Sequence, residues 1–328
     1  MELLAEDLPT PQAGEGRVRI LAADVGFSDV NVRRGRYPGA PKPPFTPGYA
    51  MVGVIDEVGP DVTAVAVGQV VGAVTFVGSY SEYIVLPARD LTPVPVEVDP
   101  AEAVVLLFNY VAAFQMFYRV AHVEWGQRIL VHGAAGGIGS AFLELGRVAG
   151  LEAFGTASAG KHDLVRLLGA TPIDYRTEDF VERIAALTDG GGVDATFDPM
   201  GLAHLRQSVR TVHHGGALVA YGYLEAANRG RSPVLDVGLQ YLSMFRWSLP
   251  PRRLRTAFYD LRPTMRNHPA WYRADLATLF ALLEERRLRP VIAARMPLEE
   301  VVSAHQRLER GDVKGRLVLI PNAQSAEP

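Results

Sequence analysis

The sequence contains no cysteine, and this absence removes two classes of site at once. Disulfide bonds cannot form, and a zinc site with thiolate ligands cannot be built. The chain is therefore compatible with a reducing compartment. The net charge is also small, −3 over 328 residues, so the composition gives no overall attraction to nucleic acid or to an anionic membrane surface.

Long apolar runs and a leader-like start are lacking as well. No continuous apolar run reaches the roughly 18 residues of a membrane-spanning helix. Residues 1–7 are acidic and have neither the basic start nor the apolar core of a signal peptide. With 48% hydrophobic and 21% charged residues, the composition is that of an ordinary globular protein. We expect a cytoplasmic protein with no integral membrane segment, and the length favours two domains.

One glycine-rich run organises the rest of the chain. A short apolar strand over 129–131 leads into this run, and a helix with an apolar face follows from Ala141. Strand, glycine turn and helix are the context of a dinucleotide fingerprint, because the backbone must approach a pyrophosphate and the helix N–H groups must face it. The Gly-x-Gly-x-x-Gly pattern has Ala in its first position here. The predicted cofactor residues of the turn are Gly133, Ala134, Gly136, Gly137, Ile138 and Gly139. The alternative is a glycine turn that binds nothing.

The first hundred residues differ in pattern from the rest. Residues 1–100 alternate short β patterns with Pro and Gly clusters, which indicates a compact β-rich domain. A mostly apolar helix is predicted over 101–121. Strands then alternate with helices, including a helix over 202–213, as in a doubly wound parallel sheet. Residues 225–272 are an irregular excursion rich in Arg and aromatics. We expect its aromatics to pack on the second domain; the alternative is a membrane-surface or partner patch.

Several segments in combination carry a resemblance to a known family. They are residues 29–38, 44–48, the glycine-rich run, and residues 155–162, 173–176 and 198–201. Together with a β-rich first domain, they resemble the medium-chain dehydrogenase/reductases, and in detail the zinc-free quinone oxidoreductase branch of VAT-1-like type. The resemblance implies an α/β fold in which a Rossmann doubly wound parallel sheet binds NADP(H) and a GroES-like β-rich domain is catalytic. It implies a homodimer as well. The expected domains are 1–103 with 284–328, and 104–283.

The chain departs from that branch at two positions and at its start. Branch members often carry Asn at the position of Gly26 and an acidic residue at the position of Ala50. The first change removes an amide that could contact substrate or nicotinamide, and the second weakens catalytic equivalence with better-known members. Family members usually begin with one more strand before the point that matches Glu2, so we expect an edge strand of the first domain to be absent.

A catalytic zinc site is not expected. Zinc-dependent relatives use Cys, His and Glu in the first domain, and the matching segments 26–29 and 47–50 contain none of these residues. The eight histidines show no ligand spacing, and His213 and His214 are adjacent at a predicted helix end. Because no metal would hold an alkoxide, an ordinary alcohol dehydrogenase is disfavoured.

The residues after the second Rossmann strand favour NADP(H) over NAD(H). No acidic residue ends that strand to hold a ribose 2′-hydroxyl. Thr156, Ser158 and Lys161 supply hydroxyls and a cation instead, which suit a 2′-phosphate. Tyr175 matches a phosphate-side tyrosine of the family. The alternative is that Ser158 caps the next helix and Lys161 is a surface lysine.

The expected chemistry is hydride transfer from the reduced nicotinamide to the β-carbon of an enone or to a quinone ring, with donors that stabilise enolate charge. Tyr37 and Tyr49 lie in loops of the first domain that should face the cleft. Asn109 and Tyr110 lie in the first helix of the sheet domain, near where the nicotinamide is expected. Tyr37 is the favoured donor because it matches a cleft tyrosine of the family; water is the alternative proton source.

Four further residues are candidate cofactor contacts. Gly222 and Tyr223 follow a strand at its carboxyl end, where ligands bind in open α/β sheets. Lys314 and Arg316 either reach the cofactor from the last strand or are surface charges. The expected partner is a small electrophilic substrate and not a nucleic acid. The alternatives are a biosynthetic tailoring reductase for a larger polyketide-like or acyl substrate, and a nucleotide-binding interaction protein with weak redox activity.

Overall fold

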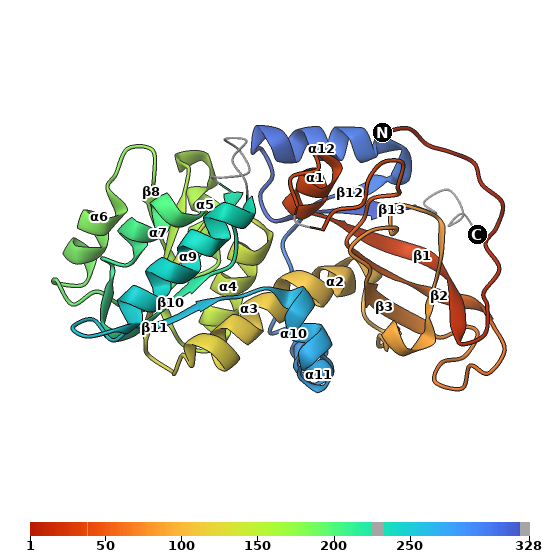
Figure 1. Cartoon of the computed structure of the whole chain (residues 1–328), viewed down its shortest axis with the longest axis horizontal. Coiled ribbons are helices and arrows are strands. Elements are labelled where there is room, and N and C mark those ends of the chain that lie inside the picture. The colour runs from red at the N-terminus through yellow and green to blue at the C-terminus, as the bar shows by residue number, and fades with distance from the viewer. Residues whose placement is uncertain (38, 225–232, 322–328) are drawn as a thin grey trace. The chain divides into compact units, whose positions relative to one another are not determined.

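The computed structural model describes residues 1–37, 39–224 and 233–321. The chain divides into two compact units, residues 1–108 with 276–328 and residues 109–275. The boundaries predicted from the sequence lie at residues 103 and 283. Figure 1 shows the β-rich first unit and the helix-covered sheet of the second.

The first unit is built on a mixed sheet that runs in the order β12-β13-β1-β2-β3-β5, with β4 paired to β1. Alternate residues of the longest strand, such as Val18 and Ile20, are buried in the core of this unit. Helices α1 (Phe27–Arg33) and α12 (Val301–Arg310) pack against each other. The strands are β1 (Glu15–Val25), β2 (Ala50–Val58), β3 (Val70–Val74), β4 (Tyr83–Pro87), β5 (Thr92–Pro93), β12 (Ile292–Pro297) and β13 (Arg316–Ile320).

The last strand of the chain returns to the first one. β13 pairs antiparallel with β1, in a register that sets Asp24 opposite Val318 and Val25 opposite Leu317. This pairing places the start of β13 beside the end of β1. As a result, side chains nearly 300 positions apart in the sequence, such as Asp24 and Arg316, lie in contact.

The second unit contains a six-stranded sheet in the order β11-β10-β9-β6-β7-β8, and every pairing in it is parallel. The order reverses between β6 and β9, which is the feature of doubly wound sheets next to which ligands bind. The predicted parallel sheet is therefore confirmed. Its elements are β6 (Arg128–His132), α4 (Gly137–Val148), β7 (Glu152–Ala157), α5 (His162–Leu167), β8 (Thr171–Asp174), α6 (Phe180–Leu187), β9 (Val193–Asp198), α7 (Leu202–Ser208) and β10 (Val212–Ala220).

The helix predicted over 202–213 is too long. α7 ends at Ser208 and β10 begins at Val212, where it pairs with Val193 of β9. The hydroxyl of Thr211 donates to the carbonyl of Ser208 and closes the turn between them. Two β-branched residues, Thr211 and Val212, oppose helix continuation at this point. His213 therefore lies in a strand and not at a helix end.

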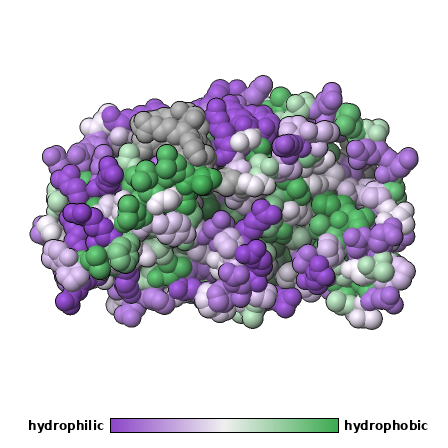
Figure 2. Space-filling view, in the orientation of Figure 1, coloured by the Kyte–Doolittle hydropathy of each residue, from purple (hydrophilic) through white to green (hydrophobic). Residues whose placement is uncertain are grey.

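The described part of the predicted irregular excursion has regular structure, while residues 225–232 lie outside the described residues. It consists of α9 (Pro233–Ser248), β11 (Arg255–Phe258), α10 (Leu261–Asn267) and the start of α11 (Pro269–Glu284). Trp271 packs under the Arg119 guanidinium and Tyr272 is buried, whereas Phe245 is 64% exposed. Figure 2 shows apolar side chains gathered over α9. Leu235 and Leu242 of this helix are exposed.

The apolar helical stretch Pro100–Ala121 is long and apolar enough to cross a membrane by length and composition alone. In the folded chain, 72% of its most apolar window is buried inside the protein, as is usual for a core helix. Asp99 accepts hydrogen bonds from the first turn, and Pro100 occupies the position where its missing N–H costs nothing. The stretch comprises α2 (Pro100–Val105), a π-helical turn η2 (Leu106–Tyr110), α3 (Val111–Gln115) and a second π-helical turn η3 (Met116–Ala121).

Candidate functional site

The glycine turn between β6 and α4 leaves no room for a side chain at Gly139 and little room at Gly136. A Cβ on Gly139 would lie 2.1 Å from the Gly133 carbonyl oxygen, and one on Gly136 would lie 3.3 Å from the same atom. Gly133 itself has φ +66°, a left-handed conformation that glycine adopts without strain. The turn therefore holds its tight shape because of the residue types that the fingerprint specifies.

The one departure from the fingerprint is compensated in the neighbouring strand. Ala134 is fully buried, and its amide donates to the Thr156 carbonyl at 3.0 Å. A Cβ on Gly155 of β7 would lie 2.6 Å from the Ala134 methyl group. Gly155 thus makes the space that Ala134 occupies, so the alanine fits without opening the turn.

The turn also presents a favourable electrostatic environment for an anion. α4 begins at Gly137 and extends for 12 residues, with Gly136 as its N-cap. The first N–H groups of a helix have no intrahelical acceptor and lie at the positive end of the helix dipole. Because the turn lies at the carboxyl end of β6, beside the point where the strand order reverses, it could hold the pyrophosphate of a dinucleotide.

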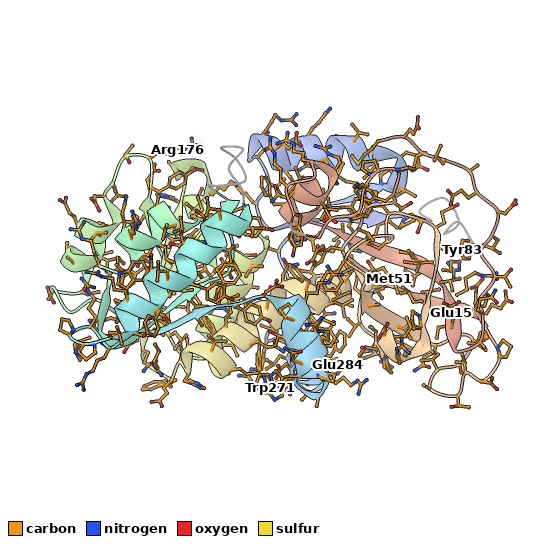
Figure 3. All side chains as sticks on the ribbon, viewed as in Figure 1. Glu15, Met51, Tyr83, Arg176, Trp271 and Glu284 are labelled. Atoms are coloured by element: carbon orange, nitrogen blue, oxygen red, sulfur yellow. The ribbon has the colours of Figure 1, made fainter. Side chains whose placement is uncertain are left out.

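Of the residues predicted to read a 2′-phosphate, Thr156 lies within β7, and the others follow β7 and β8, two adjacent strands of the sheet. Ser158 is the N-cap of the short turn η4 (Ala159–Lys161), but its side chain makes no capping hydrogen bond. Tyr175 is 52% exposed directly after β8. Its neighbour Arg176, labelled in Figure 3, carries its guanidinium 5.8 Å from the Tyr175 ring. Arg176 adds a cation that was not among the predicted site residues.

Gly222 packs tightly on the turn that follows β9. A Cβ on Gly222 would lie 2.3 Å from the carbonyl oxygen of Pro199, and the Gln240 side chain donates to the Gly222 carbonyl at 3.2 Å. Tyr223, the next residue, is partly buried. The turn after β9 therefore supports the backbone that we predicted to lie near the nicotinamide.

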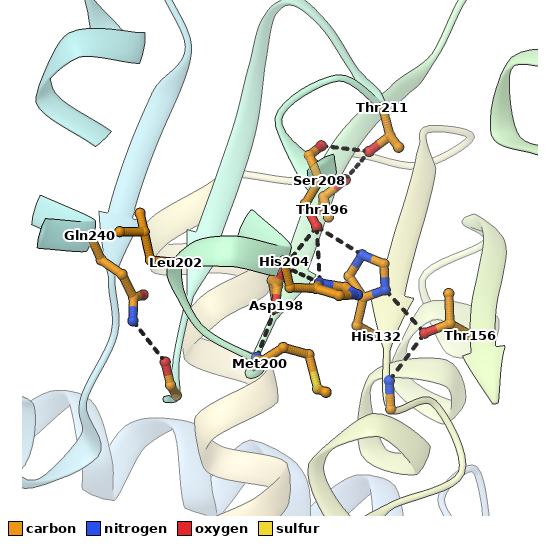
Figure 4. Close-up of polar contacts among 12 residues, drawn as sticks. His132, Thr156, Thr196, Asp198, Met200, Leu202, His204, Ser208, Thr211 and Gln240 are labelled. Atoms are coloured by element: carbon orange, nitrogen blue, oxygen red, sulfur yellow. Dashed lines mark hydrogen bonds and ion pairs between the residues drawn. The ribbon is translucent and has the colours of Figure 1, made fainter. Parts of the chain in front are cut away.

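Beneath these turns lies a buried polar cluster that the sequence spacing did not reveal. His132, Asp198 and His204 bring three potential metal ligands within 4.8 Å of one another (Figure 4). However, the Ser208 hydroxyl lies among them, 2.6 Å from Asp198 Oδ2, 3.1 Å from His132 Nε2 and 3.4 Å from His204 Nδ1. The hydroxyl oxygen fills the position between the ligands, so the cluster is a hydrogen-bond network and not a preformed metal centre.

The ionisation of this cluster follows from its surroundings. Burial opposes the charge on Asp198, but the hydrogen bond and charge of His204 outweigh it and lower the pKa of the carboxyl. Burial lowers the pKa of His132 to about 3. At neutral pH, the network therefore contains a carboxylate at Asp198 and a neutral imidazole at His132.

In the first unit, two predicted catalytic tyrosines lie in direct contact. The hydroxyls of Tyr37 and Tyr49 are 2.9 Å apart, which is a hydrogen bond. Tyr49 is buried, and its ring makes edge contacts with Phe76 at 4.9 Å and Phe108 at 4.8 Å between centroids. Tyr37 is only partly buried. The packed tyrosine therefore orients the hydroxyl of the more accessible one.

The two predicted residues of the first sheet-domain helix are both buried. Asn109 and Tyr110 lie in the π-helical turn η2. The Tyr110 hydroxyl donates to the buried carboxyl of Glu144 in α4. This hydrogen bond occupies the Tyr110 proton.

Arg316 is buried in the first unit, whereas Lys314 is exposed. Arg316 makes two hydrogen bonds to the carboxylate of Asp24, one of them at 2.7 Å. Gly26 lies against the guanidinium, since a Cβ there would be 2.6 Å from one of its nitrogens. Burial raises the pKa of neighbouring Asp29 to about 7, although its carboxyl accepts the Gly26 N–H at 2.8 Å. The Arg316 charge thus serves this buried cluster.

Two family models match the chain. A model described as the alcohol dehydrogenase GroES-like domain matches residues 12–96, and one described as zinc-binding dehydrogenase matches residues 168–319. These matches agree with the β-rich first unit and the parallel sheet of the second. The predicted fold, a GroES-like domain with a Rossmann sheet, is confirmed.

Individual proteins are similar over almost the whole chain. The synaptic vesicle membrane protein VAT-1 homolog of Danio rerio is 30% identical over 97% of this chain, which spans 66% of that protein. A quinone oxidoreductase of Pseudomonas syringae pv. tomato is 27% identical, with a TM-score of 0.84 over 98% of this chain and 95% of that one. A mycobacterial protein solved in complex with NADPH is 27% identical, with a TM-score of 0.83 over 97% and 95%.

Proposed function

The chain belongs to the medium-chain dehydrogenase/reductase superfamily, and from this premise we propose that it is a zinc-independent oxidoreductase that transfers a hydride from NADPH to an enone or a quinone. The observation that carries the proposal is the glycine turn at the carboxyl end of β6, in which Gly139 leaves no room for a side chain and Gly136 leaves little. The similar mycobacterial protein with NADPH bound supports the choice of cofactor. The similar quinone oxidoreductase supports the choice of acceptor.

The proposed cofactor residues divide by the part of NADPH that they hold. The turn 133–139 receives the pyrophosphate, because its N–H groups and the α4 dipole favour an anion. Ser158, Lys161 and Tyr175 receive the 2′-phosphate, with Arg176 as an added cation. The backbone of Gly222 and Tyr223 supports the nicotinamide. When bound, NADPH supplies the hydride.

The protein must then stabilise the negative charge that develops on the carbonyl oxygen of the acceptor. A hydroxyl that donates a hydrogen bond to that oxygen lowers the barrier and can deliver the proton. We assign this role to Tyr37. Its hydroxyl lies 2.9 Å from that of Tyr49, which is fixed by its aromatic neighbours. When the Tyr49 hydroxyl donates to the Tyr37 oxygen, the Tyr37 proton can be directed to the acceptor, and solvent water returns a proton to Tyr37 after the transfer.

Zinc independence rests on the ligand set of the first unit. The chain has no cysteine, and segments 26–29 and 47–50 contain no histidine or glutamate. The one acidic residue there, Asp29, is buried and accepts the Gly26 N–H. Substoichiometric zinc in the purified protein, with turnover unchanged by a chelator, is the expected result; activity lost to the chelator and restored by zinc would contradict it.

The first test is NADPH binding followed by turnover. We expect NADPH to bind more tightly than NADH in a fluorescence titration, and NADPH consumption with a panel of enones and quinones. Turnover restricted to larger α,β-unsaturated acyl thioesters would indicate the tailoring reductase. Tight NADPH binding without consumption on any acceptor would favour the nucleotide-binding interaction protein. Binding of neither nucleotide would refute the proposal.

Replacement of the proposed donor should affect chemistry more than binding. We expect Tyr37→Phe to lower kcat by about 100-fold, the lower range for loss of a general acid, with an unchanged Kd for NADPH. Tyr83→Phe is the matched control, since Tyr83 lies in β4 of the same unit and packs under Arg17. Steady-state kinetics at saturating NADPH measure the effect. A wild-type kcat in Tyr37→Phe would instead identify water as the proton source.

The cellular setting is part of the same proposal. The absence of cysteine and of a global charge bias agrees with a cytoplasmic enzyme that acts on a small electrophile. A homodimer follows from the family expectation, and light scattering coupled to gel filtration tests it. A mass near 36 kDa, close to the 35.6 kDa of one chain, would show a monomer instead.

A further inference from the structure

We infer that His132, Ser208 and Asp198 form a one-directional hydrogen-bond relay that orients the Thr156 hydroxyl and thereby sets the conformation of the cofactor turn. Thr156 is then a positioning residue and not a direct contact of the 2′-phosphate. This inference rests on the proposed NADPH-binding function and refines the role of one predicted site residue.

The direction of the relay starts at Asp198. Its carboxylate can only accept, and it receives the Met200 N–H at 2.8 Å, the His204 ring N–H at 2.8 Å and the Ser208 hydroxyl at 2.6 Å. A serine hydroxyl has a single proton. Because Ser208 directs this proton to Asp198, its oxygen must act as an acceptor towards His132 Nε2, 3.1 Å away.

The same reasoning continues from His132 to the turn. The imidazole is neutral and donates through Nε2, so Nδ1 is an acceptor. Nδ1 lies 3.0 Å from the Thr156 hydroxyl, which therefore donates its only proton to His132. The Thr156 oxygen then accepts the Gly133 N–H at 3.4 Å, while the Thr156 carbonyl accepts the Ala134 N–H at 3.0 Å. Thr156 thus holds two consecutive amides of the cofactor turn.

The placement of the relay explains why it can act on the turn. His132, Thr156 and Asp198 lie at or next to the carboxyl ends of β6, β7 and β9, and the register of β6 and β7 sets His132 beside Thr156 (Figure 4). All of these side chains are buried. When one side chain of the relay is removed, its buried partner is left without a hydrogen bond, which is unfavourable. Each side chain therefore depends on the one before it to keep its orientation. The turn is therefore shaped before the cofactor arrives.

A pair of Thr156 variants separates positioning from direct phosphate contact. We expect Thr156→Val, which removes the hydroxyl and its hydrogen bonds with His132 and the Gly133 N–H, to weaken NADPH and NADH binding by the same factor, about tenfold. Thr156→Ser, which keeps the hydroxyl, should restore both affinities. A selective loss of NADPH affinity in Thr156→Val would show a direct 2′-phosphate contact and overturn the inference.

A double-mutant cycle tests whether the two side chains act as one unit. His132→Leu should weaken the binding of NADPH and NADH as Thr156→Val does. The double variant should bind them only slightly more weakly than either single variant. His213→Leu is the control: the His213 ring bonds Asp194 at 3.0 Å, near the amino-terminal ends of β10 and β9 and so at the opposite edge of the same sheet. Additive losses would contradict the relay.

A measurement without cofactor keeps the relay testable if the proposed function fails. Nitrogen-15 NMR of histidine-labelled protein, with His132→Leu to assign the signal, reports which ring nitrogen of His132 carries the proton. The relay requires the proton on Nε2 at neutral pH. A proton on Nδ1, or on both nitrogens, would refute the relay whether or not NADPH binds, whereas the Nε2 form in a protein that binds no nucleotide would refute only the proposed function.

Discussion

Gly139→Ala is expected to weaken NADPH binding by about 100-fold, equivalent to about 2.8 kcal/mol. The added Cβ would lie 2.1 Å from the Gly133 carbonyl oxygen and 2.8 Å from the Ala134 Cα, both of which are backbone atoms that cannot rotate away. The turn must open to relieve this contact, and an open turn no longer presents its amides to the pyrophosphate. Fluorescence titration with NADPH measures the loss.

Two variants make this result interpretable. Gly146→Ala lies on the same helix, where the new Cβ meets its nearest neighbour, Ile129, at 3.5 Å. It should keep NADPH affinity and stabilise the helix by up to about 1 kcal/mol. If Gly139→Ala does not fold, Gly136→Ala, with its milder 3.3 Å contact, replaces it. Unchanged affinity in a folded Gly139→Ala protein would show that the pyrophosphate binds elsewhere.

Arg316→Met is expected to lower the free energy of unfolding by about 3–5 kcal/mol, the usual effect of removing one partner of a buried ion pair. Asp24 is fully buried, and its carboxylate would lose both hydrogen bonds from the guanidinium. The removed charge also faces buried Asp29. Urea denaturation followed by circular dichroism measures the change.

The control for this variant is a substitution at Lys314, two positions earlier in the sequence. Lys314→Met removes an equal charge from an exposed position and should change stability by less than about 0.5 kcal/mol. The double variant Asp24→Asn with Arg316→Met should recover part of the loss, because no charge at residue 24 is then left unpaired. If Arg316→Met unfolds like the wild type but binds NADPH poorly, Arg316 is a cofactor residue after all.

The cofactor turn could be predicted from the sequence because its requirements are local. Gly136 and Gly139 are needed by a tight strand–turn–helix connection, and all parts of that connection are adjacent in the chain. The substitution at Ala134 could not be evaluated in the same way. Its compensation lies at Gly155, on another strand, and only the pairing of β6 with β7 brings the two residues together.

The buried relay was missed for a similar reason, although a signal existed. His132, Thr156 and Asp198 belong to different strands, and no spacing along the chain connects them. Each of them nevertheless lies at or next to the carboxyl end of a predicted strand, and in a parallel sheet these ends share one edge. Polar residues at several strand ends could have indicated a cluster. The order of the strands in the sheet decides which of these residues are neighbours, and the hydrophobic pattern of the sequence does not give that order.

The tyrosine pair shows that candidate residues chosen from the sequence do not reveal their mutual contact. The sequence predicts both Tyr37 and Tyr49 as catalytic candidates, but only the fold shows that their hydroxyls form a hydrogen bond. Arg316 and Tyr110 show a different limit. The sequence makes both of them candidate site residues, but in the fold Arg316 binds Asp24 and Tyr110 binds Glu144. Long-range partners such as these decide what a polar side chain can do.

The contact between Gly26 and Arg316 also couples the residue types that these two positions can carry together. The guanidinium occupies space that any Cβ at residue 26 would enter. A Cβ at 26 therefore requires the Arg316 guanidinium to move from its place beside Asp24. A larger residue at 26 is opposed by the cost of disturbing the buried ion pair between Arg316 and Asp24. We therefore expect homologous sequences to carry glycine at position 26 whenever position 316 is an arginine bound to an aspartate.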